Sequence, residues 1–319
     1  MNACRADADS LPFEIVVKYA SDHIATRDIV RRQTRSLHRH FAEQCRTPHG
    51  IERRAGDAVW IQAHPDLPVR AWIADPDRVA DPDAVDELLA DVRRVRPDAE
   101  IRWLLYRPPD QSGVRHRLEE CGFELRVDCP GMSCAPGEGV IGDGAARDGS
   151  TGGGAIGDGM AGTASASAGA PDYAQQGLSV AAVANERDAG VWTSVYTKSN
   201  EHPPEVADAF AEALPRAWQA RTDSEWFLGY VGERPVSCAK LRIEPDEDRG
   251  VAGLYQLATL PDYRGNGYGA AIMRRLMEYG RDRYGVRFFV LQAEPEAQRL
   301  YERLGFRVDS IMAVHILNG

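Results

Sequence analysis

The second half of the chain alternates short apolar runs with longer amphipathic stretches. Runs of strand length lie at residues 178–183, 226–231, 235–243, 251–260, 287–293 and 306–316, and the second and third form a hairpin around residues 232–234. Apolar residues recur at helical spacing over about 185–199, 204–220, 270–282 and 295–304. The order β-α-α-β-β-β-α-β-α-β predicts a mixed sheet with helices on its faces.

Residues 10–130 follow this pattern less regularly, yet they resemble a second copy of it. Pro76-Asp77 aligns with Pro261-Asp262, and at the same offset IRWLLY aligns with VRFFVL. After a slip of two residues, Gly122-Phe123 aligns with Gly305-Phe306. An internal duplication of a strand-loop-helix-strand-helix-strand unit accounts for this. We therefore predict an α/β (α+β) fold with two similar domains, each a mixed, mostly antiparallel sheet flanked by helices.

The segment between the halves, residues 135–172, is dominated by Gly, Ala, Ser and Asp and has no aromatic residue. It cannot bury enough apolar surface to offset its ordering entropy, so we predict a flexible linker. Its Gly157, Gly159 and Gly162 have the spacing G-x-G-x-x-G, but no strand precedes them and no helix follows, which excludes a dinucleotide site. The predicted units are a first domain (1–130), a linker (131–176) and a second domain (177–319).

The composition narrows the class of protein. The net charge of -10 argues against non-specific nucleic-acid binding, which needs a basic face. No apolar run approaches the roughly 20 residues of a membrane span, and the first residues lack a basic region followed by an apolar core, so we expect no signal peptide and a cytoplasmic location.

A metal site is not expected either. Cys121, Cys129 and Cys134 lie near His116 in the sequence, but the C-x2-C element of zinc sites is absent. We predict reduced, mostly buried thiols.

The most informative stretch is YRGNGYG (263–269), between an apolar run and a helical stretch. Glycine permits positive φ and close approach to the backbone, and a helix N-terminus directs free N–H groups at an anion. Arg264 adds a cation that can bind a phosphate through two donors. We interpret R-x-x-G-x-G as a pyrophosphate cradle. It is not a P-loop, because no Gly-Lys-Ser/Thr follows.

Together with AQRLYERLGF about thirty residues later, LATLPDYRGNGYGAAI resembles the GCN5-related N-acetyltransferase (GNAT) family over residues 177–319. The first stretch is similar to its acetyl-CoA motif Q/R-x-x-G-x-G/A, and the second to its C-terminal L-Y-E-x-L-G-F motif. The first half resembles the degenerate N-terminal repeat of tandem GNAT proteins. The resemblance implies an acetyl-CoA-dependent N-acetyltransferase that needs no metal.

The resemblance also implies roles for particular residues. The strand before the cradle would splay at a bulge, and the backbone of Leu257, Ala258 and Thr259 would pair with the pantetheine arm, with one N–H polarising the thioester carbonyl. Tyr301 would protonate the leaving thiolate as a general acid. The pyrophosphate would be held by Arg264, Gly265, Asn266, Gly267, Tyr268 and Gly269.

Two positions depart from the family pattern. Glu294 stands where many members have a cofactor-binding Asn, and Tyr255 stands where many have a glutamate base. An amine with a pKa near 10.4 is mostly protonated at pH 7, so some group must accept its proton. Glu244 is the candidate base, and a water relay past Tyr255 or Gln256 is the alternative.

The first half is predicted not to bind CoA. The cradle position there reads RVADPDA (78–84), where Asp81 and Asp83 would repel a phosphate and Pro82 lacks an N–H. Leu118 replaces Tyr301. We therefore predict one active site per chain.

The expected acceptor is a primary amine of a small molecule. A protein amine is one alternative, and a non-catalytic acyl-CoA sensor or interaction module is another. We expect no nucleic-acid or membrane partner, and either a monomer or a homodimer. The acceptor pocket is expected around residues 190–215, a segment that contains Trp192, Tyr196, Glu201, His202 and Glu205. As alternatives, the first half covers the acceptor cleft or only holds the architecture.

Overall fold

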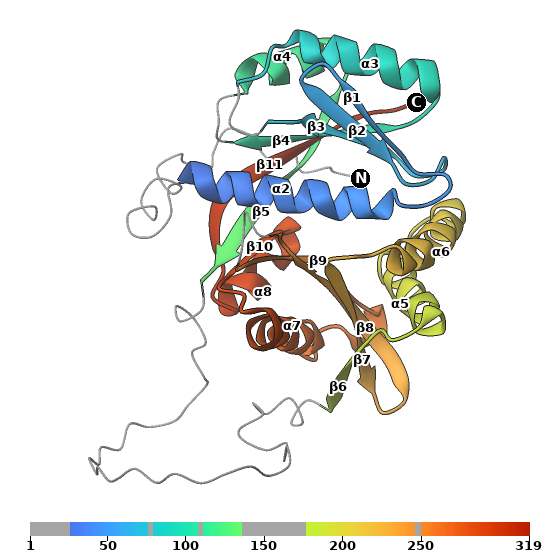
Figure 1. Ribbon diagram of the computed structural model, residues 1–319, viewed down its shortest axis with the longest axis vertical. Helices are drawn as coiled ribbons and strands as arrows, with labels where there is room; N and C mark the ends of the chain where they lie inside the picture. Colours follow the sequence, from blue (N-terminus) through green and yellow to red (C-terminus); the bar gives the residue numbers. More distant parts are fainter. Residues whose placement is uncertain (1–25, 76–78, 108–110, 136–176, 246–249) are drawn as a thin grey trace, which may run out of the picture.

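Two halves of similar order make up the computed structural model, which describes residues 26–75, 79–107, 111–135, 177–245 and 250–319 (Figure 1). The first half comprises α2 (Thr26–Gln44), β1 (Ile51–Ala55), β2 (Ala58–Gln62), β3 (Val69–Ile73), α3 (Asp83–Val95), β4 (Ile101–Arg107), α4 (Ser112–Glu120) and β5 (Glu124–Cys134).

The second half follows the order predicted for it. It comprises β6 (Leu178–Ala182), α5 (Glu186–Ser199), α6 (Pro204–Gln219), β7 (Ser224–Val231), β8 (Arg234–Ile243), β9 (Val251–Thr259), α7 (Tyr268–Tyr284), β10 (Phe288–Gln292), α8 (Gln298–Arg303) and β11 (Arg307–Leu317). The hairpin between β7 and β8 turns at Gly232 and Glu233, as expected. The helix predicted over 295–304 is divided into a 3-10 turn, Pro295–Ala297, and α8.

All strands join one sheet with the order β1-β2-β3-β4-β11-β5-β10-β9-β8-β7-β6. The last strand of each half has crossed to the other: β11 pairs with β4, and β5 pairs with β10. These two strands also pair with each other. The predicted mixed, mostly antiparallel sheet flanked by helices is confirmed, whereas the exchange of the final strands was not predicted.

The exchange bears on the predicted boundaries. β5 continues past residue 130 to Cys134, so residues 131–134 belong to the sheet. Most of the predicted linker, residues 136–176, lies outside the described residues, as does Cys4. Each half therefore takes the last strand of its sheet from the other half.

The internal duplication is visible in local geometry. Phe123 N donates to Leu118 O at 2.9 Å, and Phe306 N donates to Tyr301 O at 3.0 Å. Gly122 and Gly305 both have φ of 88°. The backbone geometry therefore agrees with the alignment that places Leu118 at the position of Tyr301.

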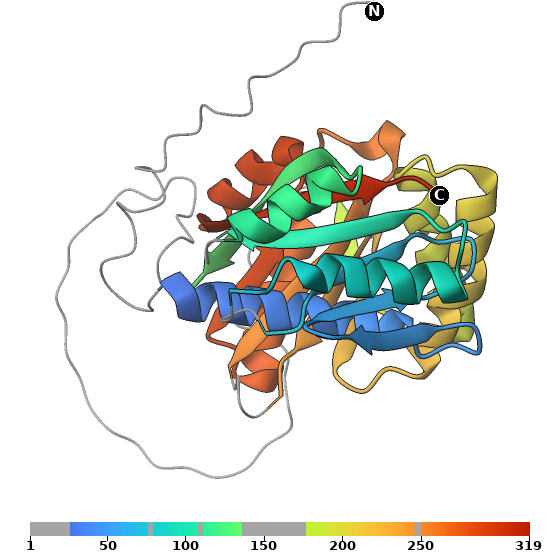
Figure 2. The same ribbon diagram turned by 90° about the horizontal axis from the view of Figure 1, so that it is seen from above.

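The helices cover the sheet in separate groups. In the first half, α3 and α4 pack on one face, and in the second half α7 and α8 do the same, while α5 and α6 cover the opposite face of β7 to β9 (Figures 1 and 2). Helix α2 lies between the halves, where Val30 and Leu37 pack among residues of both. The first half thus supplies helix α2, which packs against β9 of the second half.

Helix α2 was not predicted. Its inward positions recur at helical spacing, but many are polar, including Gln33, Ser36, His40, Glu43 and Gln44. A periodicity search based on apolar residues does not detect such a face. The signal lay in the spacing of polar residues, whose burial is favourable only when tertiary partners exist.

Candidate active site

The parallel strands β9 and β10 separate partway along their length. Their pairing covers Val251–Gly253 and Phe288–Val290. Beyond these residues β9 continues to Thr259 without pairing to β10. On its other side, β9 has a register shift against β8 between the pairs Lys240–Tyr255 and Cys238–Ala258. Gln256 takes φ of 53° there, a conformation that is uncommon for a residue with a side chain. The splay and the bulge expected in this strand are both present.

The glycine-rich loop follows the strand directly. Gly265 and Gly267 have φ of 79° and 78°, and Gly267 is the N-cap of α7 without a side-chain cap. The amides at the start of α7 therefore lack intrahelical acceptors, and the first turn of α7 holds no acidic residue. A Cβ built on Gly269 would lie 3.7 Å from Leu300 and 3.8 Å from Leu257. The loop, the bulged strand and α8 thus meet at one place.

Arg264 was expected to bind a phosphate, but its side chain makes hydrogen bonds within the protein. Its Nη2 donates to Ser199 O, and its Nε donates to Thr259 O at 3.2 Å. The side chain thus fastens the loop to the end of α5 and to the end of β9. The amides at the start of α7, by contrast, have no intrahelical acceptor and no side-chain cap.

Tyr301 lies on α8, and only 8% of it is exposed. Burial, and after it the charge of Glu294, raises the pKa of Tyr301 to about 12, so the phenol is protonated at neutral pH and can donate. Glu294 follows β10 and is exposed. Partial desolvation of its carboxyl, and after it the charge of the nearby Glu296, raises the pKa of Glu294, whereas Arg102 lowers it.

Glu244 is not brought to the bulge. It lies opposite Val251, and five residues of β9 separate that position from Gln256, or roughly 16 Å at about 3.3 Å per residue. Its side chain is 1% exposed and forms an ion pair with Arg39 of α2 at 2.6 Å. A carboxylate that is buried, paired and distant from the splay is poorly placed to accept a proton from an acceptor amine.

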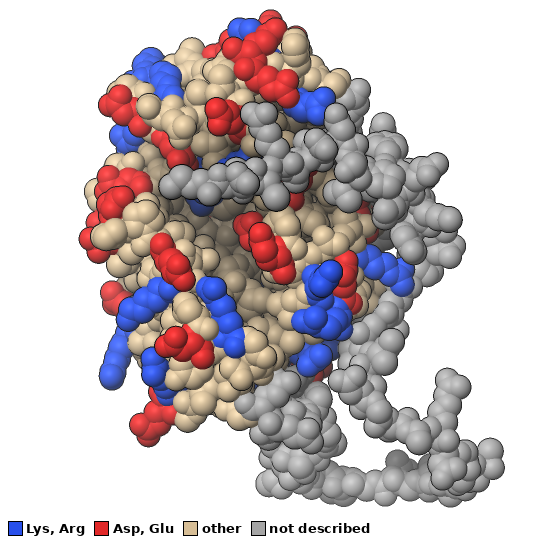
Figure 3. Space-filling model, turned by 180° about the vertical axis from the view of Figure 1, so that it is seen from behind, with Lys and Arg blue, Asp and Glu red and all other residues tan. Residues whose placement is uncertain are grey.

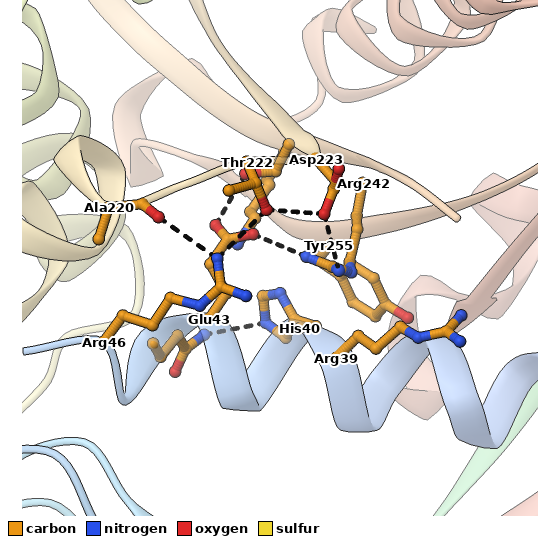
Figure 4. Close-up of polar contacts among 12 residues, drawn as sticks. Arg39, His40, Glu43, Arg46, Ala220, Thr222, Asp223, Arg242 and Tyr255 are labelled. Atoms are coloured by element: carbon orange, nitrogen blue, oxygen red, sulfur yellow. Dashed lines mark hydrogen bonds and ion pairs between the residues drawn. The ribbon is translucent and has the colours of Figure 1, made fainter. Parts of the chain in front are cut away.

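Tyr255 also faces α2 rather than the splay. Its hydroxyl donates to Ser36 Oγ at 2.7 Å. Its ring stacks on His40 with centroids 4.1 Å apart, and both residues are seen in Figure 4. Burial raises the pKa of Tyr255. The position where many GNAT proteins carry a glutamate base is therefore occupied by a contact between the two halves.

Next to this contact lies a buried charge cluster, which sequence reasoning missed. Glu43 of α2 accepts from Lys240 Nζ at 2.7 Å, from Arg242 Nη1 at 2.7 Å and from Ser224 Oγ at 2.7 Å (Figure 4). Burial by itself raises the pKa of Glu43, but Lys240, Ser224 and Arg242 together lower it. The cluster joins α2 to β7 and β8 of the second half. Its sequence signal was weak, because each residue stands alone in an ordinary-looking stretch.

At the corresponding place in the first half, the described residues leave only a small space. β3 and β4 also pair over three residues and then separate. The space left is about 20 Å³, room for about one water, and it is lined by Thr34, Trp72, Ile73, Leu104, Leu105, Tyr106 and Gln111.

The helix that follows β3 is not an anion site. Asp83 and Asp86 lie in the first turn of α3, and the Asp83 amide donates to Asp81 Oδ1 at 3.1 Å. Carboxylates thus occupy the place where the other half presents free amides, in agreement with the reading of RVADPDA.

The five residues expected near the acceptor pocket differ in their exposure to solvent. Trp192 is fully buried, while Glu201 and Glu205 are exposed. Tyr196 and His202 are half-buried, with ring centroids 6.0 Å apart. In the described part of the chain, no group of three or more His, Cys, Asp or Glu could hold a metal. None of the described helices combines the length and apolar character of a membrane span.

A splayed parallel strand pair, a bulge and a glycine cradle at the next helix define an acyl-CoA-dependent transferase. Residues 192–306 match the sequence profile of the Acetyltransferase (GNAT) family. The second half of the chain is therefore a GNAT domain, and the protein is an acetyl-CoA-dependent N-acetyltransferase. No curated protein matches the sequence significantly.

Solved structures are similar over both halves. A GCN5-related N-acetyltransferase from Kribbella flavida has a TM-score of 0.59 at 19% identity, with 94% of this chain and 97% of that chain covered. A tandem GNAT protein from the clavulanic acid biosynthesis pathway has a TM-score of 0.56 at 12% identity, with 92% and 93% covered. A GCN5-related N-acetyltransferase from Sphaerobacter thermophilus has 0.50 at 13%, with 82% and 80% covered. At these identities the likeness concerns the fold.

Proposed function

We propose that this protein acetylates a primary amine of a small molecule by direct attack within a ternary complex. The observation that supports this most is the convergence of the bulged strand β9, the glycine-rich loop and α8, which carries Tyr301, next to Gly269. The first half contributes no second cradle, so one active site per chain follows.

In this proposal the backbone of Leu257, Ala258 and Thr259 pairs with the pantetheine arm, because that length of β9 is unpaired on the β10 side. An amide at the bulge polarises the thioester carbonyl. The amides of Gly265, Asn266, Gly267, Tyr268 and Gly269 hold the pyrophosphate, and Arg264 keeps the loop in position.

The chemistry requires two proton transfers. The amine nitrogen forms a bond to the acetyl carbon, and the bond from that carbon to sulfur breaks. We assign to Glu294, which follows the end of β10, the acceptance of the amine proton. The charge of its carboxylate also raises the pKa of Tyr301. Tyr301 donates its proton to the departing thiolate. Glu294, rather than Glu244, is thus the proposed base.

Two glycine substitutions test the cradle. Gly267→Ala places a Cβ on a residue with φ of 78°, so we expect acetyl-CoA to bind about 10-fold or more weakly, since the strain of roughly 1–2 kcal/mol disturbs the loop. Gly285→Ala is the matched control, because Gly285 also has a positive φ, 65°, but lies at the other end of α7, away from the loop. Isothermal titration with acetyl-CoA measures both. Equal affinity in the two variants would contradict the cradle assignment.

The activity itself is tested by titrating the full chain with acetyl-CoA and then measuring thiol release with a panel of primary amines. We expect one acetyl-CoA per chain and amine-dependent release. A stoichiometry of two would contradict the prediction of one active site per chain. Tight binding without turnover of any amine would instead support the acyl-CoA sensor.

A further inference from the structure

Two arginines of the first half lie side by side toward the second half. Arg70 of β3 and Arg102 of β4 are directly opposite in the parallel ladder, and both are half-buried. Their neighbours Val69 and Ala71 belong to the core beneath α3 and α4. Since side chains alternate along a strand, the arginines point to the other face. Arg70 indeed lies over the ring of Phe41 in α2, 4.6 Å from its centroid.

The positive charge of Arg70 is poorly compensated by neighbouring groups. Within the residues that the structure describes, its only direct contact as a cation is the Phe41 ring, with no carboxylate in hydrogen-bonding or ion-pair distance. Burial lowers the pKa of Arg70 to about 10, and Arg102 adds to this. Arg102 differs, because its Nε donates to Glu100 at 2.6 Å. Holding a desolvated guanidinium without a partner is costly unless a ligand supplies the anion.

The side of the first half that carries Arg70 and the bulge share one apolar cluster. Tyr196 of α5 packs in this cluster together with Leu67 of the first half and Ala258 beside the bulge. Burial raises the pKa of Tyr196, and Arg70 opposes this. Gln256 Oε1 and His202 Nε2 are buried and have no hydrogen-bond partner among the described residues. Burial, then Arg102 and Arg70, lowers the pKa of His202, so its ring is neutral at pH 7. The bulge and the ring beside Tyr196 thus each present a buried polar atom without a partner.

A group of opposite charge, Glu294, follows the end of β10. Arg102 lowers the pKa of Glu294, and Glu294 raises the pKa of the Tyr301 phenol. On the face opposite to that of Figure 1, the molecule is hollowed between its two halves, with acidic and basic side chains around the hollow (Figure 3). An acceptor that reaches from the arginines to the bulge would meet cations and a carboxylate.

We propose that the acceptor is a small amine that also carries an anionic group, a carboxylate or a phosphate, which binds to Arg70 and Arg102. The amine would lie at the bulge beside Glu294. This inference rests on the proposed acetyltransferase function and deepens it. It also gives the first half a role in the reaction, because both arginines come from the repeat that has lost its own cradle.

The test compares matched acceptors that differ only in the anion. L-Lysine and cadaverine, L-ornithine and putrescine, and phosphoethanolamine and ethanolamine are assayed by thiol release from acetyl-CoA. We expect at least one anionic member to exceed its partner in kcat/KM. In Arg70→Gln, KM for that acceptor is expected to rise about 10- to 100-fold, the loss of one charge-assisted contact. kcat, the KM of the partner without the anionic group and acetyl-CoA affinity should change little.

The ratio of kcat/KM for the two members of a pair is independent of how much variant protein folds, so a poorly folding Arg70→Gln remains informative. Arg70→Lys, which keeps a cation, should restore part of the ratio. The lysine and phosphoethanolamine pairs distinguish a carboxylate from a phosphate. Turnover of the amines that lack the anionic group in preference to those that carry it, or an unchanged ratio in Arg70→Gln, would overturn the inference while leaving the acetyltransferase intact. Absence of turnover with every amine would overturn both.

Discussion

Replacing Tyr301 by phenylalanine is expected to lower kcat by roughly 10²-fold or more, the usual contribution of a general acid. The phenol is protonated at neutral pH because burial raises its pKa to about 12. Phenylalanine keeps the ring, which is packed against Phe306, and removes only the proton donor. Acetyl-CoA affinity should therefore change little. Steady-state kinetics with the best acceptor, combined with titration of acetyl-CoA, measures both quantities.

Two comparisons make this prediction specific. Tyr279→Phe, which alters a half-buried tyrosine packed against Phe227 in the same core, should keep the wild-type kcat. Glu294→Gln should remove the acid limb of the pH profile, because the base must be ionised and its pKa is raised, so the rate climbs as pH rises through that value. Tyr301→Phe should keep that limb and lower the plateau. An unchanged plateau would rule out Tyr301 as the acid.

Replacing Glu43 by glutamine is expected to destabilise the whole protein by about 3–5 kcal/mol, as when one partner of a buried ion pair is removed. The substitution leaves Lys240 fully buried and Arg242 nearly so, without the carboxylate that accepts from both at 2.7 Å. Because Glu43 lies on α2 of the first half and its partners lie on β8 of the second, the effect also measures how strongly the halves are coupled. Denaturant unfolding of both proteins gives the free-energy difference.

The matched control is Glu119→Gln on the exposed face of α4, where the ion pair with Arg115 at 3.9 Å is worth less than about 1 kcal/mol. The pKa of Glu43 is lowered in the folded protein, so its stabilisation is present above the unfolded pKa of about 4.3 and is lost as pH falls through the lower folded value. The difference between wild type and Glu43→Gln should therefore shrink in acid. A loss of stability no larger than that of the control would contradict the buried cluster.

Much of the second half could be predicted from its sequence, because its signals are local. The alternation of apolar runs located β6 to β11, and the glycines of YRGNGYG reflect backbone angles that Gly265 and Gly267 adopt. The duplication was readable because Gly122-Phe123 and Gly305-Phe306 end equivalent helices. Helix α2 escaped prediction, since its buried residues are polar and become favourable only when partners from the other half arrive.

The sequence by itself determined the GNAT motifs, the glycine-rich loop and the absence of such a loop from the first half, since these depend on residue types within a few positions of each other. Only the tertiary structure decided that β5 and β11 exchange places, that Glu244 is paired with Arg39, and that Arg70 lies over the Phe41 ring of α2. The physical reason is range. Backbone conformation and helix-end electrostatics act within one turn, whereas strand exchange and burial of charge are fixed by groups that lie far apart in the chain and meet only when the sheet closes around α2.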